Sequence, residues 1–322
     1  MLRIQDIVLL FVVFSSIAGG VLFPGFGSWF REFPVYGMMG LLLLSFLSVP
    51  LNSIRQLIRK SPGSVAYLLV AKMVVLPLAV YFIFEWLFPS HALAALLLAG
   101  ISPAVMSPLI SEMLAANSAF VIVGMASSCF LVPVTLPALV KLLAGRTMVI
   151  SFTAMVRTLS LVVFIPFIAA ELLKRFYPRA ADRLLALRYP ASLLIISLQM
   201  LGIFSAYAEV FRRQASIIGV ALVASFAVAA VSFLAALLFS WRMPVREQLS
   251  YLIAIAMPNN VLSMVFAAQF FGAIEPLVSA IYMVPFWLLL IPMRMYQKLR
   301  LTPAEASGKE PLPKVEPAGR ES

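Results

Sequence analysis

Charged and reactive side chains are scarce in this chain of 322 residues. Lys, Arg, Asp and Glu together make up 11% of the sequence, there is one His and one Cys, and 63% of the residues are hydrophobic. A chain this apolar is not a soluble globular protein. The single Cys129 excludes an intrachain disulfide, and no group of residues has the spacing of a metal site, a nucleophilic centre or a phosphate-binding loop. The sequence therefore gives no support for an enzyme, a metal cofactor or an ATPase.

Positive charge outweighs negative charge, with a formal net charge of +11. The Lys and Arg residues lie between apolar runs and in the C-terminal tail, which is where cytoplasmic loops of membrane proteins carry them. We therefore expect the lipid bilayer as a partner, and no nucleic acid. The first apolar run has no Ala-x-Ala cleavage site, so we expect a retained helix rather than a signal peptide.

Ten apolar segments are long enough, or nearly long enough, to cross a bilayer as helices. The ten predicted spans are Ile7–Phe23, Val35–Leu51, Val65–Phe88, Ala92–Leu114, Phe120–Leu143, Thr158–Leu173, Ala191–Tyr207, Ser216–Phe239, Leu249–Phe271 and Leu277–Met293. The distribution of Lys and Arg, with Arg188 among the inner residues, favours a multi-pass protein of the inner (plasma) membrane with both termini in the cytoplasm. Residues 301–322 are rich in Pro, Glu, Lys, Gly and Ser and predict a disordered cytoplasmic tail.

Two of the ten segments carry prolines and polar residues in their middle. Ala92–Leu114 contains Ser102-Pro103 and Ser107-Pro108, and Leu249–Phe271 contains Met257-Pro258-Asn259-Asn260. A proline inside a helix removes a backbone hydrogen bond, and in lipid the freed carbonyl needs another partner. A pair of interrupted segments at corresponding positions of two halves indicates the binding site of a secondary transporter. The sequence thus predicts two broken helices that cross at a polar site.

The two interrupted segments also divide the chain into five plus five spans, with the join near Gly145–Arg146. Pro103 and Pro258 have the same separation in sequence as Pro137 and Pro292. An odd number of spans in each half turns the second copy over in the membrane. We therefore predict an all-α polytopic membrane protein of ten transmembrane helices in two inverted five-helix repeats, residues 1–145 and 146–300.

These motifs resemble the bile acid:sodium symporter family. Pro133-Val-Thr-Leu-Pro137 and Val140-Lys-Leu-Leu-Ala-Gly145 fit the end of an Ala/Ser-rich helix of that family, and Ala256-Met-Pro-Asn259 is similar to its Gly-Met-Gln-Asn sequence. The resemblance implies a core domain of helices 3–5 and 8–10 and a panel domain of helices 1, 2, 6 and 7. It also implies a secondary transporter that works by alternating access, with a small organic anion bound between the two domains.

Several positions that furnish the sodium ligands of the family hold other residues here. Ala254 and Pro258 stand where the family has an acidic residue and a Gln, and Pro108-Leu109 stands where it has Ser-Asn. Lys72 stands at a family Gln, five residues before Pro77. Hard cations need several oxygen ligands. These departures point away from sodium coupling and make Lys72 or protons its candidate replacement.

Two charged residues in the spans have alternative interpretations. Lys72, well inside its span, is either a fixed cation or proton carrier beside the broken helices, or a side chain that reaches back to the membrane surface. Glu112 is either the partner of Lys72 or a solvated carboxylate at a helix end. Asn259 and Asn260, the two amides of the second break, either satisfy its freed backbone groups or contact substrate, or they join helices by hydrogen bonds.

The candidate substrate- and ion-binding residues are Lys72, Ser102, Pro103, Ser107, Glu112, Ser128, Met257, Pro258, Asn259, Asn260 and Ser263. Serine in a membrane helix often bonds only its own i−4 carbonyl, so the serines that flank the first break rank above the others. Two other functions stay open: a non-transporting membrane sensor or scaffold, and a facilitative efflux carrier. The sequence does not name the cargo, the direction of transport, the coupling ion or the oligomeric state.

Overall fold

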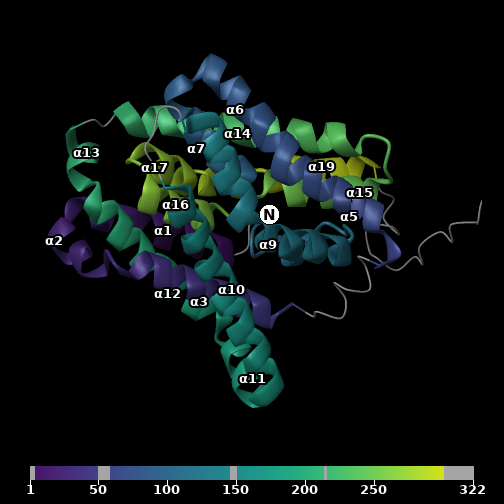
Figure 1. Ribbon diagram of the computed structural model, residues 1–322, viewed down its shortest axis with the longest axis horizontal. Coiled ribbons are helices and arrows are strands. Elements are labelled where there is room, and N and C mark those ends of the chain that lie inside the picture. The colour runs from purple at the N-terminus through teal and green to yellow at the C-terminus, as the bar shows by residue number, and fades with distance from the viewer. Residues whose placement is uncertain (1–3, 50–58, 146–150, 214–215, 301–322) are drawn as a thin grey trace, which may run out of the picture.

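The computed structural model describes residues 4–49, 59–145, 151–213 and 216–300, and every regular element within these ranges is a helix (Figure 1). In chain order the elements are α1 (Ile4–Leu22), α2 (Pro24–Gly27), η1 (Ser28–Phe30), α3 (Phe33–Leu47), α5 (Pro62–Val70), η2 (Ala71–Val75), α6 (Leu76–Leu87), η3 (Pro89–His91), α7 (Ala92–Gly100), α8 (Ser107–Met113), α9 (Ser118–Ala144), α10 (Phe152–Phe176), α11 (Pro178–Ala186), α12 (Arg188–Ala206), α13 (Ala208–Arg213), α14 (Ser216–Ser240), α15 (Val245–Ala256), α16 (Asn260–Phe270), α17 (Ile274–Ile281), α18 (Met283–Leu288) and α19 (Leu290–Arg300). The predicted tail, residues 301–322, lies outside the described residues, as does Arg146 at the predicted join.

Six described helices are long and apolar enough to cross a membrane. They are Pro62–Leu87, Ser118–Ala144, Phe152–Phe176, Arg188–Ala206, Ser216–Ser240 and Ile274–Arg300. A seventh crossing is added if the bent pair Phe11–Leu22 and Pro24–Phe30 is one span. The remaining predicted spans are shorter helices or are interrupted. The chain is therefore an all-helical, multi-pass membrane protein.

The first predicted span, Ile7–Phe23, matches α1 to within a few residues, and the chain bends where this span ends. The chain leaves α1 at Phe23 and turns by 107° into α2 and η1. Pro24 stands at the first position of α2, and a residue before proline is pushed out of the helical conformation. The bend lets the segment fold back onto α12.

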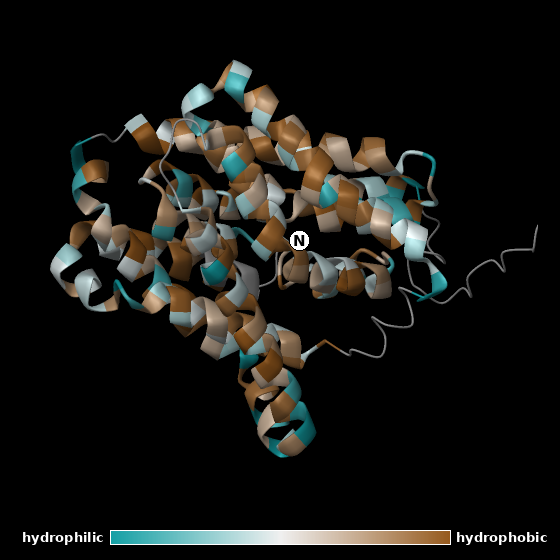
Figure 2. Ribbon diagram, viewed as in Figure 1, coloured by the Kyte–Doolittle hydropathy of each residue, from teal (hydrophilic) through white to brown (hydrophobic). Residues whose placement is uncertain are grey.

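The helices form two groups in contact with each other (Figure 1). The panel group consists of α1, α3, α10 and α12, which pack chiefly on one another. The crossing group consists of α5 to α9 and α14 to α19, in which α6 packs on α7, α14 on α15 and α16 on α17. Figure 2 shows apolar residues along most of the helices and polar residues gathered at helix ends and in α11. Since large apolar side chains such as Trp86, Leu234 and Leu238 are exposed, these surfaces suit contact with lipid.

The panel group depends on close backbone contact around α12. A Cβ atom at Gly202 would lie 2.2 Å from the carbonyl oxygen of Phe30, and one at Gly27 would lie 2.6 Å from Cβ of Ser205. Small residues let membrane helices approach closely where apolar burial gives little driving force. Glycine at these positions therefore allows η1 and α2 to lie directly on α12.

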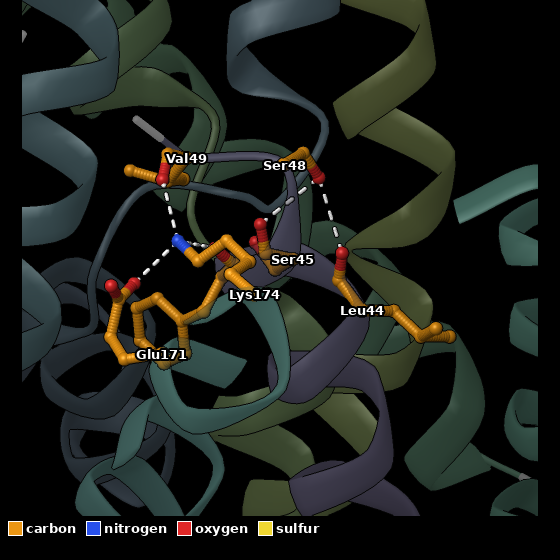
Figure 3. A network of polar contacts seen from close by, with 7 residues as sticks. Leu44, Ser45, Ser48, Val49, Glu171 and Lys174 are labelled. Atoms are coloured by element: carbon orange, nitrogen blue, oxygen red, sulfur yellow. Dashed lines mark hydrogen bonds and ion pairs between the residues drawn. The ribbon is translucent and has the colours of Figure 1, made fainter. Parts of the chain in front are cut away.

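Cationic side chains bond to the carbonyls at the ends of panel helices. The ammonium of Lys174 donates to the carbonyls of Phe46 and Val49, at 3.2 and 3.1 Å, and forms an ion pair with Glu171 (Figure 3). The guanidinium of Arg212 donates to the carbonyls of Val21 and Leu22 at 2.8 Å. Cations are favourable at this end of a helix because its last carbonyls lack intrahelical partners and carry partial negative charge.

Candidate functional site

The two interrupted segments meet, as the sequence predicts. Between α7 and α8, and again between α15 and α16, the chain is extended, and Pro103 and Pro258 form an antiparallel bridge. The amide N–H of Ala104 donates to the carbonyl of Met257, and that of Asn259 donates to the carbonyl of Ser102, both at 2.8 Å. Each break thus supplies hydrogen-bond partners to the other, which meets the requirement that lipid imposes on broken helices.

The last carbonyls of α15 receive donors from three parts of the chain. Lys72 donates its ammonium to the carbonyl of Ile255 at 3.1 Å, and Tyr282 donates its hydroxyl to the carbonyl of Ala256 at 2.8 Å. The next carbonyl, that of Met257, takes part in the bridge. Both donor side chains are fully buried. The end of α15 is therefore held by one positive charge and two neutral donors.

Lys72 reaches this position from η2, a turn of π-helix in which the N–H of Leu76 donates to the carbonyl of Ala71. Pro77 follows and has no N–H to continue an α-helical ladder. Wide turns of this kind recur at functional sites. The ammonium is 0% exposed, so the interpretation in which Lys72 reaches back to the membrane surface is wrong.

The pairing of Lys72 with Glu112 is also wrong. Glu112 is exposed in the last turn of α8, and among the described residues Lys72 forms no ion pair. The helix-end position matches the other interpretation of Glu112, a solvated carboxylate. A buried ammonium without a carboxylate is costly, and the carbonyl end of α15 is the compensation that the described residues give it.

Asn259 and Asn260 both lie at the crossing, but their side chains make different hydrogen bonds. The side-chain oxygen of Asn259 accepts from the N–H of Leu262 at 3.1 Å and so caps α16, while its Nδ2 is buried and has no partner among the described residues. Nδ2 of Asn260 donates to the carbonyl of Ser279 at 3.4 Å. Asn260 thus joins α16 to α17, and Asn259 keeps a free donor.

The four candidate serines fall into two sets. Ser128 donates to the carbonyl of Gly124 in its own helix at 2.6 Å, and Ser263 bonds to the hydroxyl of Ser279 at 2.9 Å, so both make contacts within the crossing group. Ser102 and Ser107 are fully buried beside the first break. The hydroxyl of Ser107 has no partner in the described part of the chain.

A cavity of about 240 Å³ lies between the two groups and ends at the crossing. Its panel side comes from α3 and the first part of α12, and its other side from both breaks, α8, the start of α16 and α18. Most of its wall is apolar, with Met38, Leu41, Met106 and Phe286 among the lining residues. The described residues that line it include no acidic side chain.

Two buried donors in the cavity wall have no partner among the described residues: Nδ2 of Asn259 and Nε1 of Trp287. The half-buried Arg188 also lines the cavity. A buried polar group without a partner costs free energy, so this wall suits a ligand that accepts hydrogen bonds. Sequence reasoning missed Trp287 and took Arg188 for a loop residue, and no local pattern sets either apart from other apolar-flanked Trp and Arg residues.

The crossing does not fit a sodium site. A sodium ion needs several oxygen ligands, yet the carbonyl of Ile255 already accepts from an ammonium, and those of Ala256 and Met257 also have donors. Ala254 and Pro258, which the resemblance sets against an acidic residue and a Gln, offer no side-chain oxygen. The crossing therefore offers too few free oxygen ligands for a sodium ion.

Comparison with models of known protein families gives a match. A family model described as "Sodium Bile acid symporter family" matches residues 36–214. The match contains Lys72 and the first break, and it ends before α15. Comparison with curated proteins gives no match. Because the matched range is more than half of the sequence, the chain belongs to the sodium bile acid symporter family.

Proposed function

We propose that this protein carries a small organic anion across the membrane by alternating access, with the cavity beside the crossing as its binding site. Membership of the family implies a secondary transporter of the bile acid/sodium symporter type, and members of the family are transporters rather than enzymes. The observation that carries the proposal is the cavity between the panel group and the crossing group: among the described residues that line it, two buried donors have no partner and none is acidic. Such a wall favours an anion with apolar surface over a cation.

The proposed movement is of the crossing group against the panel group. This assigns the panel group to the panel domain and the crossing group to the core domain. The ten predicted spans then form two inverted repeats, residues 1–145 and 146–300, whose broken helices supply the shared bridge. The bridge and the donors at α15 support this, because they tie both breaks into one unit that can move without losing its hydrogen bonds.

The proposed orientation has both termini in the cytoplasm of the inner (plasma) membrane, so the cavity faces the cytoplasm. The residues that line it include Asn259 at the crossing and Arg188, the first residue of α12. Beyond the crossing, at the other end of α12, the hydroxyl of Tyr207 lies 3.5 Å from the carbonyl of Ala268 in α16. The structure therefore corresponds to an inward-facing state in this proposal.

Lys72 is proposed to replace the coupling sodium. Its ammonium bonds to the end of a broken helix at the crossing, where it supplies a positive charge that an ion would otherwise have to bring. A positive charge supplied by the protein itself makes bound sodium unnecessary, and protons or the substrate gradient then drive the cycle. Lys72→Gln, which restores the residue that the family resemblance sets at this position, is expected to alter uptake without preventing expression.

Uptake into proteoliposomes tests the proposal. Radiolabelled taurocholate and shorter aryl carboxylates are offered under imposed sodium, proton or no gradient. We expect saturable uptake that does not require sodium. Strict sodium dependence contradicts the role of Lys72, whereas binding without flux for any anion contradicts transport and favours a sensor. Flux that never responds to an ion gradient favours a facilitative carrier.

A further inference from the structure

Arg188 is the one Lys or Arg residue among the described residues that line the cavity. It is the first residue of α12, it lines the cavity, and it is half buried. Its guanidinium donates one hydrogen bond, at 3.0 Å, to the hydroxyl of Ser48 at the end of α3, and it forms no ion pair among the described residues. A guanidinium has five N–H donors in a rigid fork. Most of this fork is therefore without a protein partner in the described part of the chain.

The surface beside Arg188 is basic. The stretch from Glu171 to Arg188 carries five cationic side chains and two acidic ones. One of these charges is already compensated, because Lys174 pairs with Glu171. Arg175, Arg179 and Arg183 are exposed at the end of α10 and on α11, which projects from the rest of the molecule (Figure 1). Positive charge on the surface near a binding site raises the local concentration of anions and speeds their arrival.

We propose that Arg188 selects the charge of the cargo: it binds the acidic group of the organic anion while the apolar wall of the cavity holds the rest. The inference rests on the proposed transport function and deepens it. The hydroxyls of Ser192, one helical turn from Arg188, and of Ser45, buried on α3, also line this end of the cavity. A planar fork matches a carboxylate or sulfonate with two parallel hydrogen bonds. Cargo of the same shape without charge is therefore held less tightly.

A merely structural role for Arg188 makes a different prediction. The bond to Ser48 joins the end of α3 to the start of α12, so loss of Arg188 could act by loosening the panel group. Ser48→Ala removes that bond and keeps the positive charge. The two roles are separated because only charge selection requires the guanidinium itself.

The experiment compares 4-phenylbutanoate with 4-phenylbutanamide, which share a shape and differ in charge. Apparent affinities are measured by thermal-shift titration of the purified full chain in detergent, for wild type, Arg188→Gln, Arg188→Lys and Ser48→Ala. Arg212→Gln is the matched control, because Arg212 bonds to the end of α1 and does not line the cavity. We expect wild type, Ser48→Ala and Arg212→Gln to prefer the acid about tenfold or more, Arg188→Lys to keep part of this preference, and Arg188→Gln to lose it.

Three results overturn the proposal: equal or absent binding of the two compounds by wild type, a full preference in Arg188→Gln, or a loss in Ser48→Ala as large as that in Arg188→Gln. If Arg188→Gln does not fold, Arg188→Lys decides, since an unchanged preference in it contradicts recognition by the planar fork. Proteoliposome uptake is read separately. Selective binding without flux contradicts transport and leaves the assignment of Arg188 standing, whereas flux without selective binding contradicts the assignment alone.

Discussion

The crossing group and the panel group both place a lysine ammonium on helix-end carbonyls, but the two lysines have different surroundings. Lys174 in the panel group bonds to two carbonyls at the end of α3, pairs with Glu171, and keeps 27% of its side chain exposed (Figure 3). Lys72 in the crossing group bonds to one carbonyl, is fully buried, and has no ion pair in the described part of the chain.

The two ammonium groups therefore differ in the free-energy cost of their burial. Lys174 costs little to hold because water and a carboxylate share its charge. Lys72 carries the full cost of desolvation with only a carbonyl in return, and stability alone does not favour such an arrangement. It lies where the two broken helices meet, and this position is the basis for the role in transport proposed above. The panel group, in contrast, gains its stability from close backbone packing.

The largest expected effect tests that packing. Gly202→Ala places a Cβ atom 2.2 Å from the carbonyl oxygen of Phe30, so we expect the free energy of unfolding to fall by about 3 kcal/mol. The measurement is unfolding of the purified protein in detergent. Gly219→Ala on α14 is the matched control, because its added Cβ meets no atom within 4 Å. Equal melting of the two variants contradicts the assigned role of glycine in the panel group.

Replacement of each lysine by Met tests whether the two ammonium groups differ in their importance for transport. Lys72→Met is expected to lower uptake more than about tenfold, because the crossing loses its charge, a change of at least about 1.4 kcal/mol in the transport barrier. Lys174→Met is expected to leave uptake within about twofold, since its contacts lie inside the panel group. Uptake into proteoliposomes is normalised to the reconstituted protein. Similar losses in both variants would mean that burial does not distinguish the two lysines.

Two asparagine residues that cap helices allow a second test, in which one cap lines the cavity and the other does not. Asn259 caps α16 at the crossing, and Asn117 caps α9 away from the cavity. Substitution of either by Ala is expected to lower stability by about 1 kcal/mol. Of these two variants, only Asn259→Ala is expected also to weaken anion binding. Asn259 lines the cavity and has a buried donor without a partner among the described residues, whereas Asn117 does not line the cavity. Thermal melts with and without 4-phenylbutanoate measure both effects, and equal ligand shifts in the two variants count against a ligand contact by Asn259.

The smallest expected effect is that of the panel ion pair. Glu171→Gln removes the negative partner of Lys174 but leaves the bonds of the ammonium to Phe46 and Val49. Partly exposed pairs contribute about 0–1 kcal/mol, so we expect a shift in melting temperature close to the error of the measurement. A fall of more than about 2 kcal/mol in the free energy of unfolding would show that the carboxylate of Glu171, rather than the two carbonyls, is the main partner of Lys174.

Local sequence was a good guide to the breaks and a poor guide to their partners. The prolines at Pro103 and Pro258 predict interrupted helices because the missing N–H acts on the turn in which it occurs, and the structure confirms both breaks and their contact. The first predicted span ends at Phe23, as α1 nearly does, but the sequence does not predict the direction in which the chain then turns, because an apolar run gives no sign of direction. The predicted pairing of Lys72 with Glu112 is wrong, since Glu112 is exposed in the last turn of α8 and forms no ion pair with Lys72.

Hydropathy and proline act over neighbouring residues, so the amino-acid sequence is enough to predict an apolar, all-helical membrane protein and the places where its helices break. The motifs in the same sequence also indicate a family of transporters. Only the tertiary structure decided which carbonyl Lys72 meets and that Arg188 lines a cavity. The first contact joins residues 183 positions apart and the hydrogen bond of Arg188 joins residues 140 positions apart. Such pairs depend on how whole helices pack, and the packing of helices in lipid depends on shape and on satisfied polar groups rather than on hydropathy.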